Sequence, residues 1–458
     1  MRNGALVALA AGALVAAADA ALSRRIAFDD LPSAVQRSLS AVGIDAAAFP
    51  AFIARVEDET ARRVAEGERE HLIYYALQST RFTSRRPIEP ARSAQRFIDG
   101  LPPGERERIL ADPAYVPPSG WPPPERARVV ELLGAVRGSP KDPRLTYFGE
   151  LLRSSRVDTT PDALYPDYVR VARFLYQKEF GAPGAAAAGV ADMARLYQLR
   201  PHSSDTQIEA GFGVYLGLGT LHGLDPAFRA TNVLVVGPGL NLAPRTDLID
   251  AVEPQSYQPF AVADAMLSLS LASEAGLHVQ SIDVNPRVVG WLQGVARDGV
   301  TLQFFTGISE TSDRPFSPEY RTYVRNLGRA IGTAAAASAA VRSAPRYQHS
   351  ISVRPAIARA IGAARLNVVI ERLETAFDVV VATNVLTYFD DRELALALAN
   401  IGAMLRPGGY LLHNEARAGL VEAADSVGLP TLHTRTAVLA GSAERTMYDV
   451  VYLHQRKK

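Results

Sequence analysis

The stretch Asn232-Val-Leu-Val-Val-Gly-Pro-Gly239 is the sequence feature that most constrains the fold. Four consecutive apolar residues, three of them β-branched, suit a strand that is buried on both faces of a parallel sheet. The run stops at Gly237-Pro238-Gly239, where glycine permits a tight turn and a close approach of the backbone to a ligand. A strand that runs into such a turn is how α/β proteins form a nucleotide site at the carboxyl edge of the sheet. We therefore expect an α/β fold with a ligand at this turn.

A second strand is expected at His278–Asp283, because it leads to Pro286, which opens a helix over Arg287–Ala296. An acid at the end of the second strand suits hydrogen bonding to ribose hydroxyls. Asp283 could also cap the helix that follows, and the two roles are compatible. Glu253 is the alternative ribose acid, ranked second because it comes too soon for a full crossover helix to precede it.

Later segments continue the alternation of strands and helices, with insertions at 240–259 and 299–365. The larger insertion is expected to hold an alanine-rich helix near Ala330–Ala340. The last two strands are close enough in sequence to pair antiparallel. The expected helices are Phe260–Ala275, Arg392–Leu405 and Ala418–Val427, and the expected strands are Leu366–Ile370, Phe377–Thr383, Tyr410–Asn414, Leu432–Leu439 and Met447–Leu453.

The N-terminal half has a helical pattern, and we expect a helical domain over 26–190 followed by a main domain over 191–458. Its prolines make 101–124 a loop or linker. Residues 193–222 are polar and aromatic, and Asp205 is placed to cap a helix that starts at Gln207. This segment is either a packing helix or a lid over the ligand of the glycine turn.

Residues 1–25 resemble a secretory signal: Arg2, an apolar run, Ala18-Asp19-Ala20 and then Arg24-Arg25. Residues 5–22 could instead form a short membrane anchor or an amphipathic helix, or the start codon could be misassigned. A length of 458 residues allows two or three domains, and a net charge of +1 gives no indication of nucleic-acid binding. The absence of cysteine excludes disulfides and thiolate chemistry, and the scattered histidines suggest no metal site.

Two motifs carry a resemblance to a known family: Phe377-Asp-Val-Val with Asn384-Val-Leu-Thr-Tyr-Phe389, and Leu405-Arg-Pro-Gly-Gly-Tyr-Leu. Together with the element order, they resemble the class I S-adenosylmethionine-dependent methyltransferases over residues 230–458. The Asn384 run, with a long insertion before the third strand, is similar to the chemotaxis-receptor (CheR-like) methyltransferases. The resemblance implies a doubly wound, mostly parallel Rossmann-like methyltransferase sheet with an antiparallel last strand, and S-adenosyl-L-methionine as cofactor.

By this resemblance, Gly237, Pro238 and Gly239 would wrap the amino-acid part of the cofactor. Asp283 would hold the ribose hydroxyls. The residues beside the adenine would be Val284 and Asn285.

The resemblance also places residues after the third and fourth strands. Glu371 and Arg372 would lie near the adenine edge, whereas Thr383, Asn384 and Leu386 would line the floor under the sulfonium. This chain departs from the family pattern at the end of its first strand, where a valine replaces the usual acid.

Direct methyl transfer needs a general base only when the acceptor carries a proton of high pKa, so little catalytic signature is expected. The acceptor, a small molecule or a protein, would present oxygen or nitrogen. Polar residues expected near it are the candidate catalytic residues Asn384, Tyr388, Tyr197 and His202, with His413.

Two alternative functions remain. A NAD-dependent oxidoreductase would need a small residue where this chain has Leu242. A non-catalytic binding or scaffold protein could retain the same fold. We expect the catalytic domain to work on the cytoplasmic side, where the cofactor is made, although the signal-like start points to export.

Overall fold

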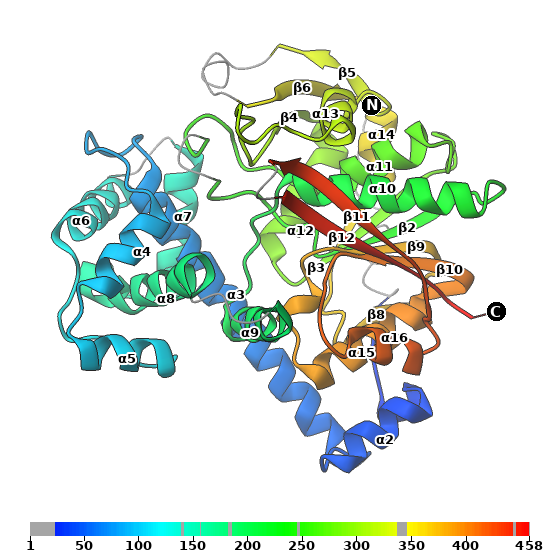
Figure 1. Ribbon diagram of the computed structural model, residues 1–458, viewed down its shortest axis with the longest axis horizontal. Coiled ribbons are helices and arrows are strands. Elements are labelled where there is room, and N and C mark those ends of the chain that lie inside the picture. Colours follow the sequence, from blue (N-terminus) through cyan, green and yellow to red (C-terminus); the bar gives the residue numbers. More distant parts are fainter. Residues whose placement is uncertain are drawn as a thin grey trace, which may run out of the picture.

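A computed structural model describes residues 23–138, 142–155, 157–181, 186–244, 248–336, 346–442 and 446–457. A seven-stranded sheet lies at its centre, in the order β7-β3-β2-β9-β10-β12-β11 (Figure 1). β7, β3, β2, β9 and β10 are parallel, and β12 is antiparallel to both of its neighbours. The mostly parallel sheet with an antiparallel last strand is therefore confirmed. Its strands are β2 (Asn232–Val236), β3 (His278–Asp283), β7 (Ile361–Arg365), β9 (Phe377–Ala382), β10 (Leu405–His413), β11 (Thr431–Gly441) and β12 (Thr446–Gln455).

Helices cover both faces of this sheet, so β2 is buried on both sides as its apolar run predicts. Val233 and Val235 belong to one hydrophobic core, and Leu234 and Val236 belong to the other. This alternation follows from the period of two along a strand. The first core includes α10 (Ile208–Leu224), α11 (Gln258–Ser268) and α12 (Pro286–Asp298), and the second includes α2 (Ser33–Ala41), α15 (Asp391–Met404) and α16 (Leu420–Ser426).

The third strand lies five residues earlier than the sequence suggested. The expected strand Leu366–Ile370 is wrong, because β7 ends at Arg365 and the apolar run forms a buried turn instead. Asn400 of α15 donates its side-chain amide to the carbonyls of Val368 (2.8 Å) and Val369 (3.2 Å). These bonds satisfy buried carbonyls that a strand would have paired with a neighbouring strand.

α11 is also shorter than expected, since it ends at Ser268 and not at Ala275. Ser270 has a left-handed backbone (φ 57°), and the N–H of Leu271 donates to the carbonyl of Met266 at 2.8 Å. This is the geometry that terminates a helix, reached here without glycine.

The larger insertion forms a three-stranded antiparallel sheet at the top of Figure 1. The alanine-rich helix expected near 330–340 is wrong where the structure describes this segment, because residues 332–335 form the strand β5. Residues 337–345 lie outside the described residues. A Cβ at Gly332 would lie 2.3 Å from the carbonyl oxygen of Ser352, so the close strand pairing depends on this glycine. The elements are β4 (Thr301–Phe305), α13 (Pro318–Asn326), β5 (Gly332–Ala335), β6 (Gln348–Val353) and α14 (Pro355–Ala360).

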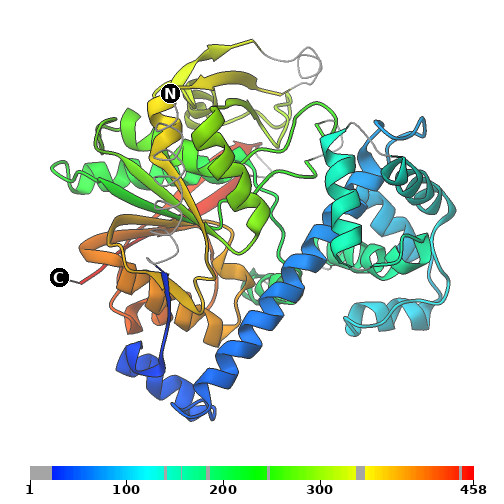
Figure 2. The ribbon, with the colours of Figure 1, turned by 180° about the vertical axis from the view of Figure 1, so that it is seen from behind.

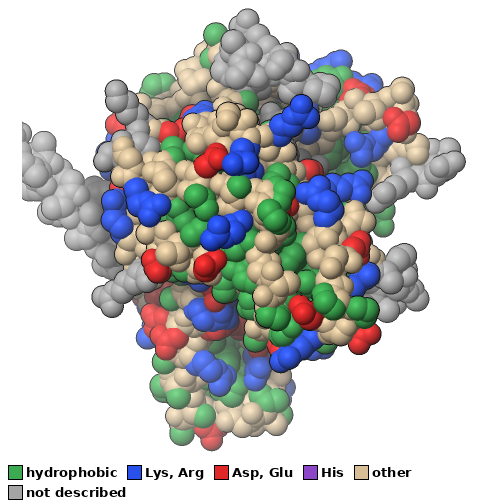
Figure 3. Space-filling view, turned by 90° about the vertical axis from the view of Figure 1, so that its left-hand side faces the viewer, with side chains coloured by type: hydrophobic (Ala, Val, Ile, Leu, Met, Phe, Trp, Pro, Cys, Tyr) green, Lys and Arg blue, Asp and Glu red, His purple; other side chains and the backbone are tan. Residues whose placement is uncertain are grey.

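The N-terminal half builds a helical lobe beside the sheet, and the long helix α3 (Phe49–Gln78) runs from the sheet into it (Figure 2). The expected loop 101–124 is wrong in part, because it contains the helix α5. This helix begins with a proline, and a proline at the first helical position loses no intrahelical hydrogen bond. On the outer face of this part of the molecule, basic and acidic side chains are interspersed with apolar ones (Figure 3). The other helices are α4 (Pro90–Asp99), α5 (Pro103–Ala111), α6 (Pro123–Arg137), α7 (Pro143–Ser154), α8 (Pro161–Phe180) and α9 (Ala186–Leu199).

The first described residues belong to the core of the main domain. β1 (Ser23–Arg25) pairs with β8 (Glu371–Leu373), and the start of α3 packs under the sheet through Phe52 and Val56. The second half of α3 belongs to the core of the lobe. The region expected as one helical domain, 26–190, therefore contributes to two cores. Residues 1–22, which hold most of the signal-like segment, lie outside the described part, and no described helix is both long and apolar enough to cross a membrane.

Candidate active site

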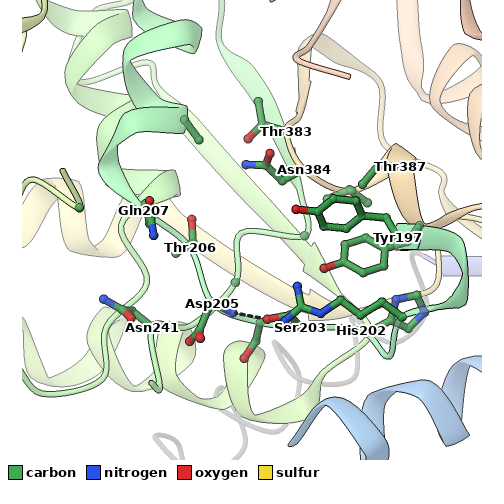
Figure 4. A pocket seen from close by; sticks show the side chains of 18 of the residues that line it. Tyr197, His202, Ser203, Asp205, Thr206, Gln207, Asn241, Thr383, Asn384 and Thr387 are labelled. Carbon is green, nitrogen blue, oxygen red and sulfur yellow. Dashed lines mark hydrogen bonds between the residues drawn. The ribbon is translucent and has the colours of Figure 1, made fainter. Parts of the chain in front are cut away.

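A cavity of about 1510 Å³ opens at the carboxyl ends of β2, β3 and β9. The sheet contributes its glycine turn, Asp283, Thr383 and Asn384, while α3 and the segment Tyr197–Gln207 contribute the opposite wall. Thr383 and Asn384 lie across the cavity from Ser203 and Asp205 (Figure 4). Residues from segments distant in sequence thus share one space, as expected at the ligand edge of an α/β sheet.

The glycine turn after β2 has the backbone that its sequence predicts. Gly237 and Gly239 have φ angles of 62° and 71°, in the region that favours glycine. An added Cβ would lie 2.5 Å from a Val385 methyl group at Gly237 and 2.4 Å from the carbonyl oxygen of Ser204 at Gly239. The two positions therefore need glycine, and the turn they form is a cradle that suits the close approach of a cofactor.

Asp283 ends β3 inside the cavity. Its carboxylate accepts from the backbone N–H of Asn285 (2.8 Å) and of Gly239 (3.4 Å), and burial raises its pKa to about 6. The side chain of Asn285 is the cap of α12, because it accepts from the N–H of Arg287 at 3.0 Å. The alternative acid, Glu253, is exposed and forms an ion pair with Arg81, so it does not line the cavity.

The residues expected at the adenine edge lie elsewhere. Glu371 and Arg372 are on β8, where Arg372 forms an ion pair with Asp30 (3.3 Å), and neither lines the cavity. Since β7 ends five residues earlier than expected, its carboxyl end delivers other residues to this place. They are Leu366, Asn367 and Val368.

Two further cofactor candidates are not among the lining residues. Pro238 lies in the glycine turn, and Leu386 is buried beneath the cavity, where its N–H donates to Glu415 at 3.0 Å. Val284, Asn285, Thr383 and Asn384 do line the cavity.

Asn384 is held by a reciprocal contact that the sequence did not reveal. Its backbone is left-handed (φ 58°), a conformation that asparagine tolerates better than most residues. Its N–H donates to the side chain of Asn414 (2.9 Å), which in turn donates to the side chain of Asn384 (3.2 Å) and to Asp449 (2.9 Å). Asn414 and Asp449 thus extend the site toward β12. No motif marks either residue: Asn414 follows β10, and Asp449 lies within β12.

Tyr388, Tyr197 and His202 form an aromatic wall. The ring centroid of Tyr388 is 5.8 Å from that of Tyr197 and 5.3 Å from that of His202. Burial, together with the Arg63 guanidinium, lowers the pKa of His202 well below its ordinary value, and burial raises the pKa of Tyr388. At neutral pH the imidazole is uncharged and a weak base, while the phenol keeps its proton. This wall is therefore suited to contact more than to proton transfer.

The segment before α10 lies directly against α3 and the glycine turn. A Cβ at Gly67 of α3 would lie 1.8 Å from the carbonyl oxygen of His202, and the carbonyl of Ser204 accepts from the N–H of Leu240 at 2.7 Å. The expected cap by Asp205 is wrong. Its carboxylate accepts from the N–H groups of residues 242 and 243 in the smaller insertion, so it ties that insertion to the wall.

His413 lies outside the lining of the cavity. It is fully buried, with its ring 2.8 Å from that of His454 between the two Nε2 atoms. Burial and the neighbouring imidazole lower the pKa of His454 to about 4, so His454 is neutral at pH 7. No group of three or more potential metal ligands occurs among the described residues.

Residues 334–428 match the family model of the CheR methyltransferase SAM-binding domain. None of the curated proteins matches the chain.

Similar solved structures include the N-methyltransferase NodS from Bradyrhizobium japonicum, with 14% identity over 59% of this chain and 99% of that one (TM-score 0.28). Magnesium protoporphyrin IX methyltransferase from Synechocystis is 10% identical over 54% of this chain and 80% of that one (TM-score 0.28). Likenesses at this level say nothing about the acceptor.

The mostly parallel sheet with its antiparallel β12 is the one that the resemblance implied. The matched segment includes the strand and turn that close the floor of the cavity. Over residues 334–428 the chain is therefore similar to the SAM-binding domain of the CheR methyltransferases.

Proposed function

We propose that the protein transfers the methyl group of S-adenosylmethionine directly to a nitrogen or oxygen atom of a small-molecule or protein acceptor. One observation carries this proposal. A single cavity extends from Asp283 and the glycine turn, past Asn384, to Gln207 and Asp449. A cofactor held at the first end and an acceptor held at the second would meet at Asn384.

The residues at the cofactor end suit the parts of that molecule. The glycine turn would approach the amino-acid part, Asp283 would accept from the ribose hydroxyls, and Val284 with Asn367 would lie beside the adenine. Bound S-adenosylmethionine supplies an electrophilic methyl group. Holding two reactants together can lower a barrier by several kcal/mol, so the protein needs chiefly to position them.

The wall formed by Tyr197, His202 and Tyr388 would exclude water from this end. Thr383 accepts a hydrogen bond from Gln258, and Asn384 donates to Asn414, so both residues of the floor are tied to neighbouring elements. Such a floor would hold the acceptor in line, which is the geometry that direct transfer requires.

We also propose that the domain works on the cytoplasmic side. The cofactor is made in the cytosol and carries charge, so an exported enzyme would lack its methyl donor. N-terminal sequencing of native protein from separated cell fractions tests this. A mature chain that begins near residue 21 outside the cytoplasm would contradict it.

Calorimetric titration with S-adenosylmethionine and with NAD, followed by incubation with methyl-labelled cofactor and fractionated cell extract, tests the function. We expect binding of S-adenosylmethionine alone, and label in an acceptor fraction. NAD binding, or tight cofactor binding without transfer to any fraction, would favour an oxidoreductase or a scaffold protein.

A further inference from the structure

The acceptor end of the cavity is lined by carboxylates and side-chain amides. Glu209 projects from the first turn of α10, Asp449 from β12 and Glu415 from the segment after β10. The side-chain amides beside them are those of Gln207, Asn384 and Asn414.

Glu209 is a buried carboxylate at this end of the cavity, and only one of its two oxygens accepts hydrogen bonds from the protein. The residue is 8% exposed, and its Oε1 accepts from the N–H of Gly307 (2.6 Å), the N–H of Ile308 (3.2 Å) and the hydroxyl of Tyr320 (2.9 Å). Its Oε2 has no hydrogen-bond partner among the described residues. A buried carboxylate oxygen without a partner is costly, so a donor from a ligand would stabilise it.

Asp449 lies along the same side of α10. A Cβ at Gly213, one helical turn after Glu209, would lie 3.7 Å from Oδ2 of Asp449. Asp449 therefore lies beside the helical turn that follows Glu209, and both residues line the same cavity. Burial raises the pKa of Asp449, which makes it a stronger base than an exposed carboxylate.

Two arginines border this end of the cavity, and both donate hydrogen bonds to other groups of the protein. Arg346 donates to the carbonyls of Thr306 (3.1 Å) and Gly307 (2.7 Å), and Arg417 donates to the carbonyl of Phe389 and pairs with Asp391. A negatively charged acceptor at this end would lie beside the carboxylates of Glu209 and Asp449, and like charges at close range disfavour binding.

We propose that the acceptor is an amine, bound as its ammonium ion between Glu209 and Asp449, and that Glu209 selects it. This inference rests on the methyl transfer proposed above. The ammonium nitrogen passes one proton to a carboxylate, and its freed lone pair forms the new C–N bond. The S–CH₃ bond breaks with its electron pair on sulfur, which leaves a thioether and an N-methylammonium product.

Binding of three probes of similar shape to the protein loaded with S-adenosylhomocysteine tests this inference at pH 7. The probes are benzylamine, which is protonated, benzyl alcohol, which is neutral, and benzoate, which is negative. We expect benzylamine to bind at least about tenfold more tightly than the other two, as hydrogen bonds to charged groups suggest. Equal affinities, no benzylamine binding at millimolar concentration, or a preference for benzoate would overturn the inference.

Glu209→Gln should lower benzylamine affinity about tenfold and leave benzyl alcohol unchanged, because glutamine retains the Oε1 acceptor for Gly307 and Ile308. Asp449→Asn should act in the same direction. Glu319→Gln, on the exposed side of α13, is the matched control and should change neither probe. Unchanged benzylamine affinity in both acidic-site variants would also overturn the inference.

The proposed function has a separate readout. If S-adenosylhomocysteine does not bind, the methyltransferase proposal itself fails. If it binds and label is transferred, base-labile label would indicate a methyl ester and contradict the amine, whereas base-stable label on nitrogen would support it.

Discussion

The two walls of the cavity are built in different ways. On the sheet side, each lining position lies within a few residues of a strand end, so the parallel strands β2, β3 and β9 set its place. On the helical side, the segment before α10 is held to α3 by contacts between residues far apart in sequence. Arg63 donates to the carbonyl of Arg200 (2.8 Å), 137 positions away, and buried Glu70 forms an ion pair with the Arg200 side chain (3.4 Å).

Because of this difference, substitutions in the two walls should have different effects on cofactor binding and on stability. The sheet wall depends on backbone conformation, and changes there should affect the cofactor directly. The helical wall depends on close packing and buried charge, and changes there should affect stability as well. Four variants separate these effects.

Gly67→Ala should have the largest effect, because its Cβ would lie 1.8 Å from the carbonyl oxygen of His202. We expect the free energy of unfolding to fall by more than about 3 kcal/mol, the upper end of overpacking costs. Urea denaturation measures it. Gly134→Ala on the exposed face of α6, where nothing lies within 4 Å, is the control and should be neutral or slightly stabilising. Equal stability of both variants would show that the walls are not in close contact.

Asp283→Asn should change how stability depends on pH in the protein without cofactor. Because the folded-state pKa is raised from 3.8 to about 6, the folded protein binds more protons than the unfolded chain between these values. The stability of the native sequence therefore falls as pH rises through this window, and asparagine removes that loss. The difference between variant and native free energies of unfolding should grow by up to about 3 kcal/mol from pH 4 to 7. A difference that does not change with pH would contradict the burial of this carboxylate.

Gly239→Ala should weaken S-adenosylmethionine binding about 30-fold, or about 2 kcal/mol, because it strains a left-handed position. Calorimetry measures the affinity. Gly219→Ala on α10 has open space around it and should bind as the native protein does. An unchanged affinity for the Gly239 variant would place the cofactor away from this turn.

Glu68→Gln should have the smallest effect and tests whether the lobe supports the sheet wall. Glu68 of α3 accepts from the side chain of Asn285 (2.8 Å) and pairs with Arg287 (3.0 Å), so it holds the start of α12. Glutamine keeps the first contact and loses the charge, and we expect S-adenosylmethionine to bind about fivefold more weakly, near 1 kcal/mol. Glu59→Gln on the same helix, at a partly exposed position, is the control. Equal affinities would mean that the two walls act independently.

Much of the sheet could be predicted because its signals are local. Burial on both faces selects an apolar β-branched run, so β2 and β9 appear in the sequence as they do in the fold. The edge strand β7 buries only alternate residues and includes Gly362, so its pattern is weak. The neighbouring apolar run was predicted as the strand instead, which misplaced the adenine-edge candidates on Glu371 and Arg372.

By itself, the sequence determined the glycine turn, the acid at the end of β3, a mostly parallel sheet and the motifs that resemble the methyltransferases, since each depends on a short pattern of residue types. The tertiary structure alone decided which remote residues meet at the cavity: α3 against His202, Asn414 with Asn384, and Glu209 in the same cavity as Asp449. The physical reason is that burial, charge pairing and close packing act between residues that become neighbours only when the chain folds. No spacing along the chain records those distances.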